Sequence, residues 1–237
     1  MQFFHDFSDE RNKTWCYHCT VTLGVNSTNR EHIPTKSILA KPYPANLPVA
    51  EVCARCNEQH SLDEEYFIAF LSAVLTGSTD PNAQVLKAGT SIFARNKALR
   101  RRVERNKREY QTYGGQTNVV WNPELDRIHS VVIKNAKGHA FYENGEPMFD
   151  EPRAVAVFPL ATASDEQLGS FFNGLDGLAV WPEVGSRWMQ RMVGEPCFDN
   201  DGFYVLQPGV YRYRLEFEGG VTVKTVIHEY LATYVAW

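Results

Sequence analysis

The segment T-N-R-E-H-I-P-T-K-S-I-L, residues 28–39, places a carboxylate and an imidazole side by side, at Glu31 and His32. It lies between two pairs of cysteines with the same spacing, C-Y-H-C at residues 16–19 and C-A-R-C at residues 53–56. A polar turn ahead of a helix is one interpretation of the segment. The cysteines on both sides favour another, in which the segment is folded between the two halves of one metal site.

The four paired cysteines predict a structural zinc site. In a short C-x-x-C turn, two thiolates can reach one metal ion at about 2.3 Å, and two such turns complete a tetrahedral site. Disulfides or unrelated buried thiols are the alternatives, and they suit a chain without a secretion signal less well. Cys197 stands alone and is interpreted as an ordinary buried cysteine. The predicted zinc ligands are Cys16, Cys19, Cys53 and Cys56.

The residues around the segment predict the order strand, strand, helix. Residues 21–23 are short and β-prone, and residues 30–33 are expected to form a second strand that the following proline ends. The carboxylate and the imidazole then lie on opposite sides of that strand. Apolar residues at helical spacing predict a helix that begins near residues 56–57.

The combination C-x-x-C, E-H-I-P-x-K-S, N-L and C-x-x-C-N closely resembles the HNH nucleases of the His-Me finger, or ββα-metal, superfamily. The resemblance is to the branch whose fold is held by a zinc ion on four cysteines, and it covers residues 14–75. The stretch C-N-E-Q-H-S-L-D-E-E-Y-F and the C-terminal H-E-Y-L-A also look like uncharacterised bacterial HNH endonuclease proteins.

This resemblance implies a role for each matching residue. His32 matches the general base that takes a proton from the attacking water, with a structural role as the alternative. Glu31 and Asn57 match the ligands of a Mg²⁺ or Mn²⁺ ion, although Asn57 could instead cap its helix. Asn46 matches the residue that braces the loop holding the histidine. His60 is a candidate third metal ligand or a surface residue.

Composition places the chain among ordinary globular proteins, with 237 residues, 43% hydrophobic and 22% charged. No apolar run is long enough to span a bilayer, and the N-terminal residues lack a signal-peptide pattern, so the predicted location is the cytoplasm. The formal net charge of -4 does not indicate nucleic-acid binding by the whole chain. A nucleic acid would have to be bound by a local basic patch.

Residues 91–110, S-I-F-A-R-N-K-A-L-R-R-R-V-E-R-N-K-R-E-Y, have that local concentration of positive charge. They are predicted to form a helix with one apolar face and basic side chains over much of the remainder. Eight basic against two acidic residues favour phosphate contacts over a solvated face. A docking surface for an acidic protein is the other alternative. The eight are Arg95, Lys97, Arg100, Arg101, Arg102, Arg105, Lys107 and Arg108.

The rest of the chain predicts helices and strands but no recognisable site. A short helix is expected after Asp80, and a longer one from Pro123 to Gly138. An apolar strand A-V-A-V-F-P-L, a helix capped by Ser164 and a hairpin with glycines at residues 219–220 follow. The histidines of this half do not form a recognisable metal or catalytic set.

The predicted fold is therefore α+β, in three parts. These are an HNH ββα-metal domain with a four-cysteine zinc (1–76), a basic helical segment (77–115) and an α+β domain with antiparallel strands whose role the sequence does not reveal (116–237). The predicted function is a metal-dependent endonuclease with DNA as the first substrate and RNA as the alternative, in keeping with a bacterial antiviral defence or restriction effector. The alternatives are a catalytically silent, zinc-stabilised module that binds nucleic acid or protein, and a toxin-like nuclease that a partner releases. No membrane partner is expected, and a regulatory protein or a second copy of the chain is a further candidate partner.

Overall fold

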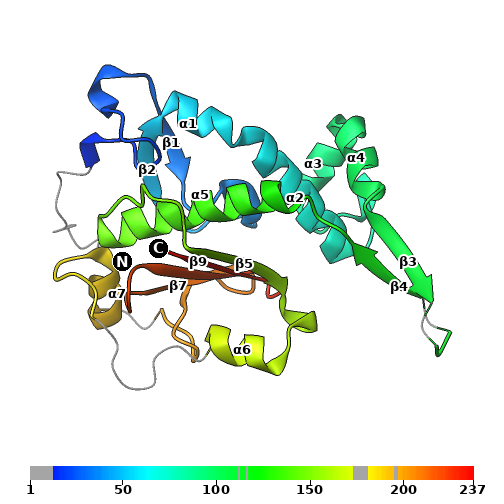
Figure 1. Ribbon diagram of the computed structural model, residues 1–237. Helices are drawn as coiled ribbons and strands as arrows, with labels where there is room; N and C mark the ends of the chain where they lie inside the picture. The colour runs from blue at the N-terminus through cyan, green and yellow to red at the C-terminus, as the bar shows by residue number, and fades with distance from the viewer. Residues whose placement is uncertain (1–12, 112, 116, 173–180, 195–196) are drawn as a thin grey trace. The chain divides into compact units, whose positions relative to one another are not determined.

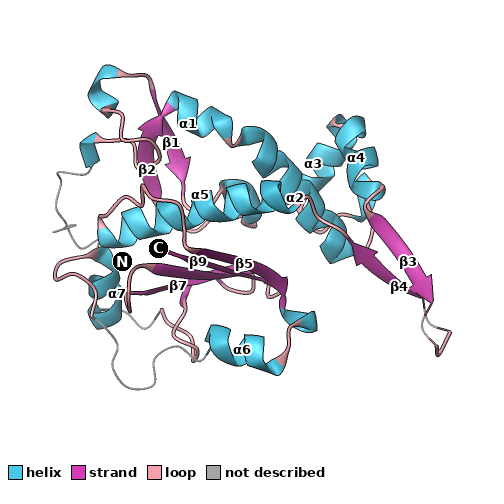
Figure 2. Ribbon diagram, in the orientation of Figure 1, coloured by secondary structure: helices cyan, strands magenta, loops and turns pink. Residues whose placement is uncertain are grey.

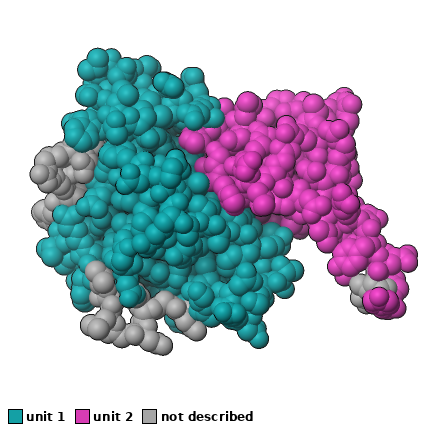
Figure 3. All heavy atoms as spheres, in the orientation of Figure 1, with its two compact units in different colours: residues 1–59, 132–237 teal, residues 60–131 magenta. Residues whose placement is uncertain are grey.

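A computed structural model of the chain describes residues 13–111, 113–115, 117–172, 181–194 and 197–237. The chain divides into two compact units, coloured separately in Figure 3. The first unit combines residues 1–59 with residues 132–237, and the second comprises residues 60–131. This division differs from the predicted boundaries at 76 and 115, because segments far apart in the sequence pack together in the first unit.

The N-terminal part of the first unit has the predicted order strand, strand, helix. Some of these elements are formed by other residues than predicted. Its elements are β1 (Thr28–His32), β2 (Val49–Cys53) and α1 (Ala54–Gln59). β1 pairs with β2 in antiparallel register. The strand predicted at residues 21–23 is wrong: Thr22 forms a single bridge with Trp15 and the 3-10 helix η2 (Leu23–Val25) follows. That bridge closes the turn with the first cysteine pair, so these residues do not pair with β1.

Five strands of the first unit form one antiparallel sheet in the order β5-β9-β8-β7-β6. They are β5 (Ala154–Pro159), β6 (Tyr204–Gln207), β7 (Tyr211–Glu216), β8 (Thr222–Ile227) and β9 (Leu231–Ala236). The predicted apolar strand is confirmed as β5, and the predicted C-terminal hairpin as β7 paired with β8. Gly219 and Gly220 in its turn have φ angles of 64° and 133°, which favour glycine.

Helices lie along both faces of this sheet (Figure 1). The helices that follow α1 in this unit are the C-terminal part of α5 (Leu125–Asn144), α6 (Asp165–Phe172) and α7 (Arg187–Gly194). On one face, His139 of α5 stacks on Tyr213 of β7 with ring centroids 3.9 Å apart. On the other, Phe171 of α6 packs with Phe203 and Val226 in an apolar cluster. Both faces of the sheet are therefore buried.

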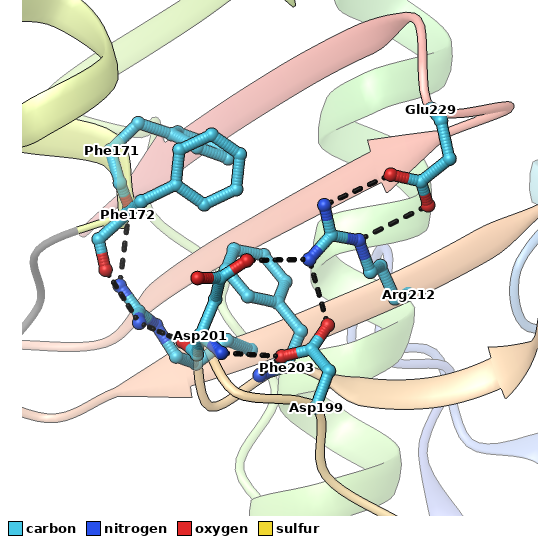
Figure 4. Close-up of polar contacts among 8 residues, drawn as sticks. Phe171, Phe172, Asp199, Asp201, Phe203, Arg212 and Glu229 are labelled. Carbon is cyan, nitrogen blue, oxygen red and sulfur yellow. Dashed lines mark hydrogen bonds and ion pairs between the residues drawn. The ribbon is translucent and has the colours of Figure 1, made fainter. Parts of the chain in front are cut away.

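Arg212 of β7 ties the sheet to two loops (Figure 4). Its guanidinium lies 2.7 Å from Asp199 and 3.1 Å from Asp201, both in the loop before β6. It also lies 3.0 Å from Glu229, in the turn between β8 and β9. One cation that donates to three carboxylates fixes these loops to β7, next to the edge strand β6.

The second unit is mainly helical and contains one two-stranded ribbon. Its elements are α2 (Ser61–Thr76), η4 (Pro81–Ala83), α3 (Lys87–Arg95), α4 (Lys97–Glu104), β3 (Lys107–Gln111), β4 (Thr117–Trp121) and the first part of α5. The short helix predicted after Asp80 is confirmed as a 3-10 turn, in which Asp80 accepts a hydrogen bond from the backbone of Asn82. Within the described residues, no helix is both long and apolar enough to cross a membrane.

The single helix predicted over residues 91–110 is wrong in two places. Asn96 interrupts it, because its side chain accepts a hydrogen bond from the N–H of Leu99 at 3.0 Å and so caps the new helix α4. After α4 the chain turns into β3, which pairs with β4. The domain boundary predicted at residue 115 falls in the loop that joins these two strands.

Gly138 lies inside α5, where the sequence predicts that helix to end. A Cβ atom at this position would lie 2.9 Å from Cγ1 of Ile33, so glycine lets the helix approach the residue after His32. Gly138→Ala is therefore expected to destabilise the protein by about 1–3 kcal/mol, although alanine normally favours a helix over glycine. The free energy of unfolding in urea measures this effect. Gly24→Ala is the control, since nothing lies within 4 Å of a Cβ there; equal effects at both positions would contradict the packing argument.

Candidate metal centre and active site

The four paired cysteines come together in one cluster. Their Sγ atoms all lie within 4.8 Å of one another, with 3.6 Å between Cys19 and Cys53, and all four are free thiols. Four sulfurs around one zinc ion at about 2.3 Å would be separated by about 3.8 Å. The cluster could therefore hold a zinc ion. Among the residues that the structure describes, it is the one group of three or more His, Cys, Asp or Glu side chains suited to a metal.

Two local turns place the sulfurs. In the first, the N–H groups of Cys19 and Thr20 donate to the carbonyl of Cys16, at 3.2 and 2.9 Å, and Thr20 has a left-handed φ of 65°. The second pair spans the junction of β2 and α1, so that Cys53 ends the strand and Cys56 lies in the helix. A pocket of about 490 Å³ is lined in part by Cys19, Cys53 and Cys56.

The thiols differ in their tendency to ionise. Burial raises the pKa of Cys16 and that of Cys56. Burial would also raise the pKa of Cys53, but hydrogen bonds from the backbone and thiol of Cys56 outweigh it and lower that pKa. A bound cation would hold all four sulfurs as thiolates, which are the form that binds zinc.

Glu31 points into the interior of the first unit, where its carboxylate has three partners. Oε2 accepts a hydrogen bond from the hydroxyl of Tyr17 and lies 2.8 Å from Nε2 of His18. Oε1 forms an ion pair with Nζ of Lys134 on α5, and the side chains of Glu31 and Lys134 are only 3% and 4% exposed. Burial alone would raise the pKa of Glu31, but His18 and Lys134 outweigh it and lower the pKa to about 2. Glu31 is therefore a buried, neutralised anion at pH 7.

This arrangement does not fit Glu31 as a ligand of a catalytic Mg²⁺ or Mn²⁺ ion. Mg²⁺ keeps several water molecules and binds carboxylates that can face those waters. The carboxylate of Glu31 instead faces an ammonium group and two further donors in a closed interior. A divalent ion would have to replace Lys134 beside Glu31.

His32 follows Glu31 on β1, so its side chain faces the opposite side of the strand. It is partly exposed. Partial burial and the positive charge of Lys36 lower the pKa of His32, which keeps its imidazole neutral near pH 7. The ammonium of Lys36 lies 4.6 Å from the ring centre of Tyr43 on the same loop. His32 thus has the exposure and the protonation state of a general base.

Asn57 and His60 are the other predicted ligands of the divalent ion. Asn57 is partly exposed on α1, and no hydrogen bond joins it to Glu31 or His32 within the described ranges. His60 belongs to the second unit, where its Nδ1 lies 3.2 Å from the hydroxyl of Ser130. The roles of Asn57 and His60 at a divalent ion stay predictions.

The C-terminal sheet holds the loop between His32 and β2. Gln207, the last residue of β6, exchanges hydrogen bonds of 2.9 and 2.8 Å with the backbone of Ala40. His228, in the turn after β8, places Nε2 2.9 Å from the carbonyl oxygen of Ile38. Asn46 donates to a tyrosine hydroxyl of β6 at 2.9 Å. The sheet is therefore a scaffold for the loop, and Asn46 reaches the sheet rather than His32.

Helix α5 supports the E-H-I-P segment from its other side. Three contacts join α5 to this segment and the threonine after it. Lys134 pairs with Glu31, and Gly138 packs against Ile33. The side-chain oxygen of Asn135 accepts from the N–H and the hydroxyl of Thr35 at 3.0 and 3.1 Å. Sequence reasoning missed Lys134 and Asn135. The sequence shows both as polar residues next to the apolar stripe of the predicted helix, but this pattern does not indicate which residues they contact.

The eight basic residues predicted to bind nucleic acid fall into two groups. Three form ion pairs: Arg95 with Glu65 at 3.0 Å, Arg102 with Glu124 at 2.6 Å and Lys107 with Glu109 at 2.9 Å. The others have no ion pair with any residue that the structure describes: Lys97, Arg100, Arg101, Arg105 and Arg108. The unpaired group is the one with charge available for a partner.

Comparison with family models, with curated proteins and with solved structures found no significant match to this chain.

Proposed function

We propose that this protein is an HNH-type endonuclease that hydrolyses phosphodiester bonds in nucleic acid, with DNA as the preferred substrate. The position of His32 is the observation that carries the proposal. Its imidazole is partly exposed at the end of β1, the strand that pairs with β2, whose last residue Cys53 belongs to the cysteine cluster. The match of E-H-I-P between two C-x-x-C pairs to the HNH pattern gives the reaction class.

In the proposed reaction, His32 takes a proton from the water that attacks phosphorus. Lys36, whose charge lowers the pKa of His32, offsets negative charge on the phosphate. The zinc ion stays structural and holds β2 and α1 to the turn before β1. The proposal includes a requirement for Mg²⁺ or Mn²⁺, and Glu31 and Asn57 would accept that ion only once Glu31 had separated from Lys134.

The ion pair between Glu31 and Lys134 favours a second candidate. A zinc-stabilised module that binds nucleic acid or protein without cutting it would keep this pair permanently. A nuclease that a partner releases would keep it until the partner separated the two residues. Both variants of this candidate give a purified protein that does not cleave.

A cleavage assay on supercoiled plasmid, single-stranded DNA and RNA tests the primary proposal. With Mg²⁺ or Mn²⁺, the wild-type protein is expected to cut plasmid, and His32→Ala to lower the rate by a factor of about 10²–10⁴, the usual contribution of a general base. His129→Ala, a histidine of the second unit, is the matched control and should cut at the wild-type rate. Zinc content and thermal melting confirm that each variant is folded.

Two results would count against this mechanism. Cleavage that survives in a folded His32→Ala variant would exclude His32 as the base. A wild-type protein that cuts none of the substrates would favour the second candidate. In that case Mn²⁺ binding by Lys134→Met, which lacks the ion pair, but not by Glu31→Gln would indicate a gated nuclease, and no binding by either would indicate a silent module.

A further inference from the structure

The ribbon of β3 and β4 exposes side chains on both of its faces. Four of the five residues of β3 are exposed, as are four of the five of β4. Figures 1 and 2 show the ribbon extending away from α3 and α4 of the same unit. A two-stranded ribbon that buries so little apolar surface is marginally stable by itself. Its side chains are thus available to a partner.

The strand register sorts these side chains into two faces. On one face, Lys107 lies opposite Trp121, and Glu109 lies opposite Val119. Lys107 and Glu109 form an ion pair at 2.9 Å, and Trp121 meets Phe70 of α2 edge to face, with centroids 6.4 Å apart. On this inner face, Lys107 and Glu109 therefore neutralise each other, and Trp121 contacts α2.

The other face, which we call the outer face, consists of Arg108 opposite Val120 and Tyr110 opposite Asn118. All four side chains are exposed, and Tyr110 is 50% exposed. Arg108 has no ion pair with any described residue. A cation, a phenol, an amide and a small apolar group are the kinds of side chain that contact phosphates, base edges and the thymine methyl group.

Further unpaired positive charge lies in α4 and at Arg105, directly before the ribbon in the sequence. Four cations there have no ion pair in the described part of the chain: Lys97, Arg100, Arg101 and Arg105. Together with Arg108 they make five unpaired cations within residues 97–108. In a protein with a formal net charge of -4, such a local concentration produces a positive potential that is complementary to phosphates. This complementarity selects a nucleic acid over an apolar partner.

The shape of the ribbon selects the form of nucleic acid. The major groove of B-form DNA, about 12 Å wide, admits a two-stranded β-ribbon. The major groove of an RNA duplex is deep and too narrow for side chains to read. We propose that the outer face of the β3–β4 ribbon enters the major groove of double-stranded DNA, while the unpaired cations of α4 contact phosphates. The choice of DNA as the ligand rests on the proposed function. The second unit would then hold the DNA that the first unit cleaves.

Fluorescence anisotropy with a labelled DNA duplex tests the ribbon, using the zinc-loaded full chain without added Mg²⁺ or Mn²⁺ so that cleavage does not interfere. Arg108→Ala and Tyr110→Ala are each expected to lower the affinity at least about fivefold, and Arg108→Ala to reduce the slope of log K against log salt by about 1. Arg102→Ala is the matched control, because Arg102 is already paired with Glu124, and should lower the affinity less than about twofold. Lys107→Ala is the equivalent control for the inner face.

The same titration with an RNA duplex and with single-stranded DNA decides between occupants. Tighter binding of DNA duplex than of either alternative supports the proposal. Tighter binding of RNA or of a single strand, equal losses in Arg108→Ala and Arg102→Ala, or no binding at low salt would each overturn it. His32→Ala should bind duplex as tightly as the wild type, so that loss of cleavage with retained binding separates failure of the catalytic proposal from failure of this one.

Discussion

Removal of zinc is expected to unfold the N-terminal part of the first unit. The buried cluster around β1, β2 and α1 is small, and Cys16, Cys53 and Cys56 are themselves members of it. Without an ion, four neutral thiols would replace four metal bonds. Zinc binding to structural sites of this type contributes about 10–16 kcal/mol in small zinc-finger peptides, which is comparable to the whole stability of a domain. Loss of the ion should therefore remove most of the folded state of this region.

Three measurements check this expectation. Purified protein should contain one zinc ion per chain, a strong chelator should lower the thermal midpoint, and added zinc should restore it. Cys56→Ser should lose the ion. Cys197→Ser is the control, since Cys197 lies outside the cluster, and it should keep both the ion and the midpoint. A protein that melts at the same temperature with and without chelator, and contains no metal, would show that the cysteines are only buried thiols.

The pair of Glu31 and Lys134 gives the second large effect. Lys134→Met leaves a buried carboxylate without its cation, and Glu31→Gln leaves a buried ammonium without its anion. Each change is expected to cost about 3–5 kcal/mol of unfolding free energy. The double variant Glu31→Gln with Lys134→Met should lose less than the sum of the two single variants, since it leaves neither charge unpaired. Urea denaturation at pH 7 measures all three.

An exposed ion pair provides the control for this cycle. Arg95 and Glu65 lie 3.0 Å apart, but the side chain of Arg95 is 73% exposed, so Arg95→Ala should cost less than about 1 kcal/mol. Additive losses in the Glu31 and Lys134 cycle would show that the two residues do not interact. A loss at Lys134 no larger than at Arg95 would contradict the buried position of the pair.

The same pair predicts how stability depends on pH. The folded protein lowers the pKa of Glu31 to about 2 from an ordinary value of 4.5. The unfolded chain therefore takes up a proton at a higher pH than the folded protein does. The stabilisation from Glu31 is fully present above pH 4.5 and is lost as the pH falls towards 2. Wild type should lose more stability between pH 6 and pH 3 than Glu31→Gln, whose side chain does not titrate.

Local signals in the sequence predicted local features correctly. The identical spacing within two cysteine pairs predicted a four-cysteine cluster, because a C-x-x-C turn brings its two sulfurs together whatever surrounds it. Ser164 predicted the start of α6, where it and Gln167 exchange hydrogen bonds with each other's backbone as a capping box requires. The glycines at residues 219–220 predicted the β7–β8 turn for the same local reason.

Features that depend on distant partners were decided only by the tertiary structure. β1 pairs with β2, and the paired residues are at least seventeen positions apart in the chain. The pairing depends on how well the two strands fit each other, which neither segment specifies by itself. Residues 91–110 were predicted to form one helix. In the structure, Asn96 divides it into α3 and α4, and the pairing of β3 with β4 replaces its last residues.

The candidate site divides in the same way. The sequence by itself determined the chemical groups present in residues 16–57: four thiols in two equally spaced pairs, a carboxylate, an imidazole and an amide. Only the tertiary structure decided that Lys134 neutralises Glu31, that His32 stays partly exposed, and that Gln207 holds the intervening loop. The physical reason is that charge, exposure and loop position depend on which distant groups lie within a few ångströms, and no local pattern specifies those neighbours.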